Sequence, residues 1–172
     1  MKVVILGCGR VGAALAKQMA GEGHDVTIID RDTGAFRRLG TRFKGTKIVG
    51  PGTDIDVLRR AGVEGADAFF SVTDGDNRNI MAAQIAKNVF NVPRVLTRLY
   101  DPNRAQAYQE MGIQTICTTA IATGLLHDMA RQDRLRPAAL PARAGRGHRG
   151  AHSAVSCRRR CCCRRRPPLN EN

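Results

Sequence analysis

The chain has 172 residues, enough for one domain of ordinary size and an appendage but too few for two full domains. Hydrophobic residues make up 42% and aromatic residues 4%, with no tryptophan, which supports a buried core and disfavours a nucleic-acid platform of stacked rings. No apolar run is long enough to span a membrane and no signal pattern precedes the first motif, so we expect a cytosolic protein.

The chain begins with a short apolar run, residues 2–6, typical of a strand covered on both faces. Glycines follow, and apolar residues then recur at helical spacing up to Gly21: Val11, Leu15, Ala16 and Met19. Strands and helices continue to alternate. The predicted strands cover residues 2–6, 25–30, 46–49, 66–72, 94–99 and 113–117. The predicted helices begin at Arg10, before Phe36, at Thr53 or Asp54, at Asn77, at Pro102, and at Thr119 or Ala120.

Six strands that alternate with helices through short loops indicate parallel pairing with right-handed crossovers. The sequence therefore predicts an α/β fold over residues 1–134, a Rossmann-like doubly wound parallel sheet in the order 3-2-1-4-5-6. In the long fourth helix, the inward face is expected to carry Ile80, Ala83, Ile85 and Val89. The two cysteines of the body, Cys8 and Cys117, are expected to be buried thiols.

A G-x-G-x-x-G motif, Gly7, Gly9 and Gly12, lies between the first strand and the first helix. The three glycines would allow a tight turn, close approach of a pyrophosphate, and close packing of helix on strand. Asp30 closes the second strand, where a carboxylate accepts hydrogen bonds from ribose hydroxyls and repels a 2′-phosphate. The motif therefore predicts NAD or an adenosine nucleotide rather than NADP.

Other polar residues follow the later strands, where ligands of this fold bind. The Arg10 guanidinium could fold over the phosphates, and Thr73 and Arg98 could line the crevice. Turn and capping duties are an equal alternative for Asp54, Asp74, Asp76 and Asn77. No side chain is placed for catalysis or metal binding in this pattern.

Five sequence blocks carry a more specific resemblance: I-L-G-C-G-R-V-G, H-D-V-T-I-I-D-R-D, G-T-D-I-D-V-L-R-R-A-G, A-D-A-F-F-S-V-T-D-G-D-N-R-N-I-M-A-A-Q-I-A and P-R-V-L-T-R-L-Y-D-P. In this order they resemble the KTN, or RCK N-terminal, domain of the Trk/Ktr potassium-uptake regulatory family. The resemblance implies a cytosolic nucleotide-sensing subunit that binds NAD(H), ATP or ADP without chemistry. It also implies a homo-dimer or higher ring beneath a membrane potassium transporter or channel.

Motif and resemblance together give one set of cofactor-binding residues: Gly7, Cys8, Gly9, Arg10, Val11, Gly12, Asp30, Arg31, Gly52, Thr53, Thr73 and Arg98. By resemblance, Arg31 would flank the adenosine, Thr53 and Thr73 the base and sugar, and Arg98 the distal phosphates. Pro51 departs from the family pattern, in which an acidic or amide residue usually stands between the glycines of that turn. Family members also continue into a second domain where this sequence changes character.

From about residue 135 the sequence consists mainly of Arg, Ala, Gly, Pro and Cys, with ten arginines against one acid. Residues 1–134 hold 18 Lys and Arg against 14 Asp and Glu, so most of the formal charge of +13 belongs to this tail. We predict that residues 135–172 are disordered and interpret them as an out-of-frame translation of GC-rich DNA. A basic arm for nucleic acid or an anionic membrane remains an alternative, and a metal site using His148, His152 and the cysteines is less favoured.

Two other functions fit parts of the sequence. An NAD-dependent oxidoreductase would need a substrate pocket and a proton donor, which a second domain usually supplies. A nucleic-acid binder would depend on the tail alone. The regulatory subunit is therefore the favoured interpretation.

Overall fold

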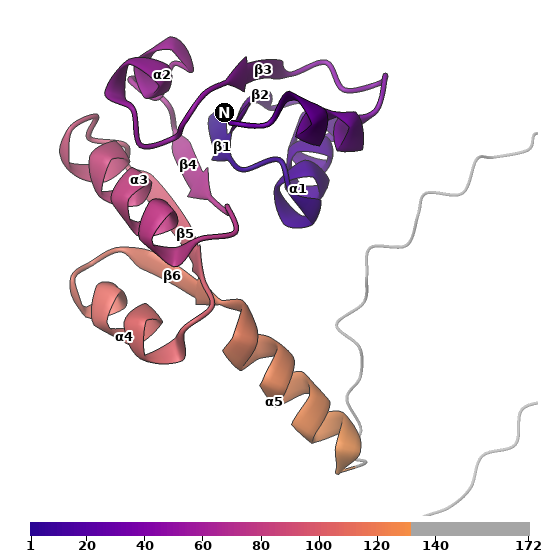
Figure 1. Ribbon diagram of the computed structural model, residues 1–172, viewed down its shortest axis with the longest axis vertical. Helices are drawn as coiled ribbons and strands as arrows, with labels where there is room; N and C mark the ends of the chain where they lie inside the picture. The colour runs from indigo at the N-terminus through magenta and orange to yellow at the C-terminus, as the bar shows by residue number, and fades with distance from the viewer. Residues whose placement is uncertain (132–172) are drawn as a thin grey trace, which may run out of the picture. The chain divides into compact units, whose positions relative to one another are not determined.

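The computed structural model describes residues 1–131 as a six-stranded parallel sheet flanked by helices (Figure 1). The strands are β1 (Lys2–Leu6), β2 (Asp25–Asp30), β3 (Thr46–Val49), β4 (Ala68–Ser71), β5 (Arg94–Leu99) and β6 (Gln114–Cys117). The helices are α1 (Arg10–Gly21), the 3-10 helix η1 (Thr33–Leu39), α2 (Ile55–Arg60), α3 (Asp76–Asn88), α4 (Pro102–Glu110) and α5 (Thr118–Ala130). The strand order, β3-β2-β1-β4-β5-β6, confirms the predicted Rossmann-like sheet.

The central strand β1 is buried on both faces, as its continuous apolar sequence predicts. Val3 and Ile5 belong to the core beneath α1 and η1, whereas Val4 and Leu6 belong to the core beneath α2 and α3. Figure 1 shows the same division, with α1 and η1 on one side of the sheet and α2, α3 and α4 on the other. The two layers of helices exclude water from both sides of the central strands β1, β2 and β4.

The register of β1 brings three strand ends together. Leu6 pairs with Ile29 of β2 on one side and with Ser71 of β4 on the other. The chain crosses to opposite faces of the sheet on either side of β1, so a crevice forms at this switch point. The residues that follow β1, β2 and β4 therefore meet at one edge of the sheet.

The inward face of α3 differs from the prediction at two positions. Val89 is 52% exposed, because α3 ends at Asn88 and Val89 lies beyond the helix as its C-cap. Asn79, which the prediction did not include, is completely buried on the inward face of α3. Val11 of α1 is 44% exposed and lies at the edge of the crevice.

Two further expectations need correction. The predicted second helix is a 3-10 helix, because a segment with Gly34 near its start and Gly40 as its cap is too short to stabilise an α-helix. Cys117 is partly exposed rather than buried, and its thiol caps α5 by accepting a hydrogen bond from the amide of Ala120 at 3.4 Å. Cys8 is buried, as predicted.

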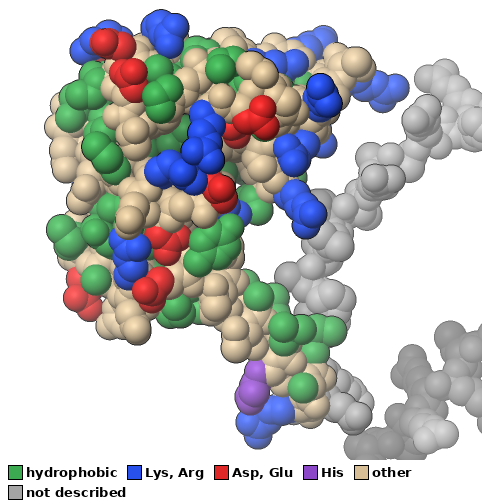
Figure 2. All heavy atoms as spheres, in the orientation of Figure 1, with side chains coloured by type: hydrophobic (Ala, Val, Ile, Leu, Met, Phe, Trp, Pro, Cys, Tyr) green, Lys and Arg blue, Asp and Glu red, His purple; other side chains and the backbone are tan. Residues whose placement is uncertain are grey.

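The described residues, 1–131, all belong to one compact unit. The predictions of a disordered, out-of-frame or metal-binding tail fall on residues 135–172, which lie outside the described residues. Within residues 1–131, no helix is both long and apolar enough to cross a bilayer. Helix α5 buries none of its residues, and Figure 2 shows apolar side chains along it.

Candidate functional site

The loop between β1 and α1 is closely packed at its first and third glycines and open at its second. Gly7 has a φ of +103°, and a Cβ there would lie 3.0 Å from the backbone nitrogen of Thr73. A Cβ on Gly12 would lie 1.8 Å from the carbonyl oxygen of Gly7. At Gly9 the φ of −71° suits any residue, and its Cβ would meet no non-adjacent atom of the described chain within 4 Å. The fold therefore requires glycine at positions 7 and 12 but not at position 9.

Asp30 closes β2 beside this loop and is only partly buried. One carboxylate oxygen accepts the amide hydrogen of Cys8 at 2.6 Å, and the other accepts that of Asp32 at 2.9 Å. An ionised carboxylate has about four acceptor positions. Asp30 therefore holds the glycine loop in place and retains capacity for donors from a ligand.

A cavity of about 500 Å³ opens over the carboxyl ends of the strands, within the usual range of small-molecule sites. Eleven of the twelve residues predicted for cofactor binding line it: Gly7, Cys8, Gly9, Arg10, Val11, Asp30, Arg31, Gly52, Thr53, Thr73 and Arg98. Gly12 is not among the lining residues, since it packs against Gly7 and the side chain of Val72. The fold thus brings segments that are distant in sequence to one site.

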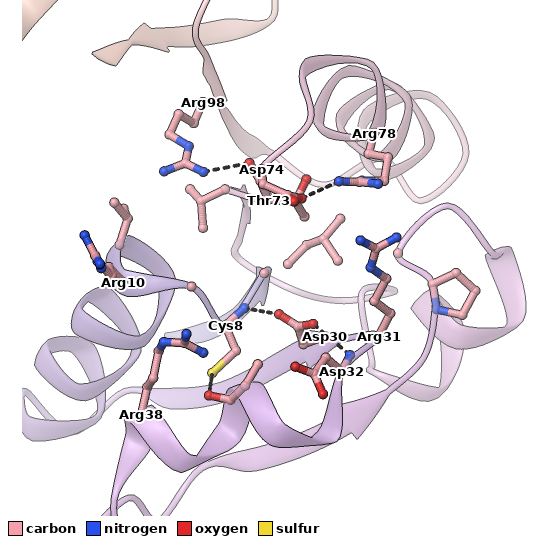
Figure 3. Close-up of a pocket in the computed structure, with 18 of the residues that line it drawn as sticks. Cys8, Arg10, Asp30, Arg31, Asp32, Arg38, Thr73, Asp74, Arg78 and Arg98 are labelled. Carbon is pink, nitrogen blue, oxygen red and sulfur yellow. Dashed lines mark hydrogen bonds and ion pairs between the residues drawn. The ribbon is translucent and has the colours of Figure 1, made fainter. Parts of the chain in front are cut away.

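Charged side chains surround this cavity on both walls (Figure 3). Its charged lining residues are Arg10, Arg31, Arg38, Arg78 and Arg98, and Asp30, Asp32 and Asp74. Five cations against three anions give a formal charge of +2, which suits a doubly negative group such as a pyrophosphate. The N-terminus of α1, which has no acidic residue in its first turn, adds free amide groups and a partial positive charge.

Asp74 and Arg78 form an ion pair at the rim of the cavity. Slight burial opposes ionisation of Asp74, but the nearby Arg78 guanidinium outweighs it and lowers the pKa of this carboxyl from its ordinary value. Because 77% of the Asp74 side chain is exposed, the pair contributes little to stability. The ion pair keeps the Arg78 guanidinium beside the opening of the cavity.

The turn after β3 forms another part of the lining. A Cβ on Gly52 would lie 2.1 Å from a methyl carbon of Leu6, so this turn packs directly on the end of β1. The carbonyl of Pro51 accepts the amide hydrogen of Asp54 at 3.2 Å. The Asp54 side chain then caps α2, which decides between Thr53 and Asp54 as the capping residue. Thr53 is left to line the cavity.

The wall at β4 and β5 is held by a residue that sequence reasoning missed. Asn79 makes five hydrogen bonds. Its Oδ1 accepts from the Ser71 hydroxyl at 3.0 Å and from the Thr73 amide and hydroxyl at 2.8 and 2.7 Å. Its Nδ2 donates to the carbonyls of Thr73 and Arg98 at 3.0 and 2.8 Å. The sequence could have indicated this burial. Ala82, Ala83 and Ala86 follow Asn79 at helical spacing, which places Asn79 on the same face of the helix, and all three alanines are buried.

Arg38, Arg78 and Tyr100 are among the lining residues that sequence reasoning did not assign to the site. Arg38 and Arg78 come from helices on opposite faces of the sheet, so no spacing along the chain relates them. Tyr100 follows β5 two residues after Arg98, and the Arg98 guanidinium lies 4.8 Å from its ring centroid. The Arg98 Nη2 also donates to the Thr73 carbonyl at 2.7 Å, while its buried Nε has no partner in the described chain.

Cys8 lies under the glycine loop and donates a hydrogen bond from its thiol to the carbonyl of Ala35 at 3.4 Å. Burial, followed by the negative charge of Asp30, raises the pKa of this thiol. Cys8 is therefore a neutral packing residue at ordinary pH. Among residues 1–131, no group of three or more His, Cys, Asp or Glu side chains could hold a metal ion.

Comparison with known proteins agrees with this geometry. Residues 3–119 match the model of the TrkA-N domain, which is more than half of the chain. The chain belongs to the TrkA-N family. This TrkA-N chain is 52% identical over 118 residues to the Trk system potassium uptake protein TrkA of Streptomyces coelicolor. The alignment covers 69% of the chain and 53% of the relative, so the chain spans about half the length of that protein.

Solved structures of other proteins share this fold. The Kef C-terminal domain of Shewanella denitrificans, in an AMP-bound form, has a TM-score of 0.66 at 19% identity and covers 76% of this chain and 80% of its own. The GsuK channel bound to NAD has a TM-score of 0.65 at 19% identity and covers 76% of this chain and 23% of its own. At this identity the similarity supports the fold alone. The resemblance predicted from the five sequence blocks is confirmed by the family match.

Proposed function

We propose that this chain is the nucleotide-binding part of a cytosolic regulatory subunit for potassium transport, and that it binds NAD(H) or an adenine nucleotide without chemistry. The observation that carries the proposal is the open second glycine. Neither backbone conformation nor packing requires glycine at position 9, whereas a pyrophosphate that contacts the loop amides does. The net positive lining of the cavity supports an anionic ligand.

The proposed ligand would lie across the switch point between β1 and β4. The amides at the start of α1 and the Arg10 guanidinium would hold the phosphates, and Asp30 the ribose hydroxyls. Arg31 would flank the adenosine, and Arg98 would reach the distal phosphates. Its guanidinium lines the cavity.

An adenosine phosphate is the part that the candidate ligands share. The Kef domain named above holds AMP and the GsuK channel holds NAD. Asp30 disfavours a 2′-phosphate at the ribose, so NADP is expected to bind more weakly than NAD. Titration with NADH, NAD⁺, ATP, ADP and AMP would show which of them binds most tightly.

The regulatory role is proposed from the relatives named for Trk potassium uptake. In this role the chain would act as a homo-dimer or larger ring at the cytoplasmic side of a membrane potassium transporter or channel. The bound nucleotide would shift the balance between two arrangements of the ring. The exposed apolar side chains of helix α5 support assembly with a second copy.

Calorimetric titration with NADH, ATP, ADP and AMP tests the binding function. We expect binding of at least one of them, weakened by about 1–3 kcal/mol in Asp30→Ala, because charge-assisted hydrogen bonds to the ribose are lost. Asp25→Ala is the matched control, since Asp25 lies at the opposite end of the same strand. Equal affinity in the wild type and in Asp30→Ala contradicts the proposal.

The same preparation separates regulation from catalysis. We expect the absorbance of bound NADH to stay constant when small aldehydes, ketones or 2-oxo acids are added. Sustained oxidation of NADH would favour the oxidoreductase alternative instead.

A further inference from the structure

We propose that Asn79 is the positioning residue of the crevice: it holds Thr73 and Arg98 in the geometry that binds an anionic nucleotide, without contacting the ligand. The inference rests on the proposed function for the role of the crevice. Asn79 is fully buried and is not among the residues that line the cavity. Its effect on a ligand must therefore pass through the residues that it bonds.

The five hydrogen bonds of Asn79 all reach the ends of β4 and β5. Three of them involve the Thr73 amide, hydroxyl and carbonyl, so one side chain fixes the backbone of Thr73 on both sides of its Cα. A fourth fixes the carbonyl of Arg98 at the end of β5. A single amide thus joins two strand ends that lie 25 residues apart in sequence.

Thr73 transmits this restraint to the phosphate loop. Its backbone nitrogen lies 3.0 Å from where a Cβ of Gly7 would be, so the two backbones are in contact and Thr73 forms one side of the glycine turn. Thr73 also accepts the hydrogen bond from the Arg98 guanidinium at 2.7 Å, which directs that group toward the cavity. Movement of Thr73 would therefore displace both the loop and the arginine.

Packing alone does not require an amide at this position. The buried residues that follow on the same face of α3, Ala82, Ala83 and Ala86, are small and apolar. A buried amide is costly unless all of its hydrogen bonds are made, and Asn79 uses its Oδ1 three times and its Nδ2 twice. A fully satisfied polar group of this kind rigidifies and specifies local structure, in this case the wall of the crevice.

A double-mutant cycle on the full chain distinguishes positioning from a general loss of stability. Asn79→Ala and Arg98→Gln are each expected to weaken ADP binding about tenfold, and the double variant by little more than either one, because Asn79 acts through Arg98 and Thr73. Thr115→Val is the matched control. It removes one hydrogen bond of a partly buried side chain, to the carbonyl of Ala105, away from the crevice. It should lower the melting temperature and leave the affinity for ADP unchanged.

Two outcomes of this cycle overturn the proposal. One is that Asn79→Ala binds ADP as tightly as Thr115→Val does. The other is that the losses in Asn79→Ala and Arg98→Gln multiply in the double variant to about a hundredfold, which is the result for independent sites.

A second variant, Asn79→Asp, tests the proposal in case Asn79→Ala does not fold. Asn79→Asp keeps the shape and the acceptor oxygen but loses both donated bonds, so its affinity for ADP is expected to improve at low pH, where a protonated carboxyl can donate again. A pH profile parallel to that of the wild type counts against positioning.

Hydrogen exchange needs no ligand. In Asn79→Asp, amides in residues 7–12 and 71–76 should exchange faster than in Thr115→Val; equal rates overturn the positioning role. If the wild type binds none of NADH, ATP, ADP or AMP, the proposed function fails, and the exchange rates alone decide whether Asn79 holds the loop.

Discussion

Gly9 and Gly12 are three residues apart, but different physical reasons favour glycine at the two positions. Gly12 is required by the protein itself, because its Cβ would overlap the carbonyl of Gly7. Gly9 faces open space at the edge of the cavity. At the scale of the single residue, a glycine that the fold does not need is the clearest indication of a ligand.

Substitution of the two glycines by alanine separates folding from binding. Gly9→Ala is expected to change the free energy of unfolding by no more than about 0.5 kcal/mol, as at other unconstrained surface positions. Its methyl group would still block the approach of phosphates and weaken ADP binding. Gly12→Ala is expected to destabilise by about 3 kcal/mol or more, because helix and strand must move apart. Thermal unfolding and calorimetry on both variants check this, and a stable Gly12→Ala or a tightly binding Gly9→Ala would contradict it.

The Cys8 thiol predicts a dependence of stability on pH. Burial raises its pKa in the folded state above the ordinary 9.0, so the unfolded chain loses this proton first as the pH rises. The neutral Cys8 thiol therefore makes its full contribution to the free energy of unfolding below about pH 9. This contribution is lost as the pH rises through the raised pKa. Urea unfolding of the wild type and of Cys8→Ala at about pH 8 and about pH 10 measures it. We expect the difference between the two proteins to shrink at the higher pH, and a constant difference would speak against a raised pKa.

Short helices in this fold depend on side-chain caps. Asp54 accepts a hydrogen bond from the amide of Asp56 at 2.8 Å at the start of α2, and Asp101 caps α4 in the same way. Helix α2 has only six residues, so propensity alone does not stabilise it. At the scale of the element, the caps and the packing of Val57 and Leu58 decide whether α2 forms.

Removal of the cap of α2 should have a measurable cost. Asp54→Ala is expected to lower the free energy of unfolding by about 1 kcal/mol, because an amide of the first turn loses its partner. Asp56→Asn serves as the control, since it removes an exposed ion pair with Arg59 and a negative charge in the first turn but leaves the cap in place, and should cost at most about 0.5 kcal/mol. Urea denaturation of the three proteins gives the comparison, and equal stability of the two variants would show that the cap is not used.

Helix α5 matters at the scale of the whole molecule. Ile121, Leu125 and Met129 recur at intervals of four on one face of α5, and with Leu126 they are 51–66% exposed. Four large apolar side chains on a helix that buries none of its residues form a surface suited to a second copy of the chain.

Charge on this surface should prevent assembly. We expect the wild type to sediment as a dimer or larger species, and Leu125→Glu with Leu126→Glu to sediment as a monomer, because two carboxylates would have to be desolvated. Ala107→Glu with Gln109→Glu places the same charges on the exposed side of α4 and should not change assembly. The measurement needs reducing buffer, since four cysteines lie within residues 157–163. A monomeric wild type contradicts the proposed dimer.

The sequence by itself determined the sheet, its order, and most of the residues that line the crevice. Apolar runs, glycines and caps act over a few residues, so β1, β2 and the glycine loop follow from local pattern. In a doubly wound sheet the carboxyl ends of the strands meet at one edge, which is why Asp30, Thr73 and Arg98 could be assigned to one site before any coordinates.

Only the tertiary structure decided which side chains complete that site. Arg38 and Arg78 reach the cavity from helices on opposite faces of the sheet, and the buried Asn79 holds its wall from behind. Val89 is exposed where helical periodicity placed it inside. Periodicity gives the face of an isolated helix, but the angle at which a helix crosses the sheet sets which residue of that face reaches the core. A buried amide such as Asn79 finds its partners only when strands distant in sequence are side by side.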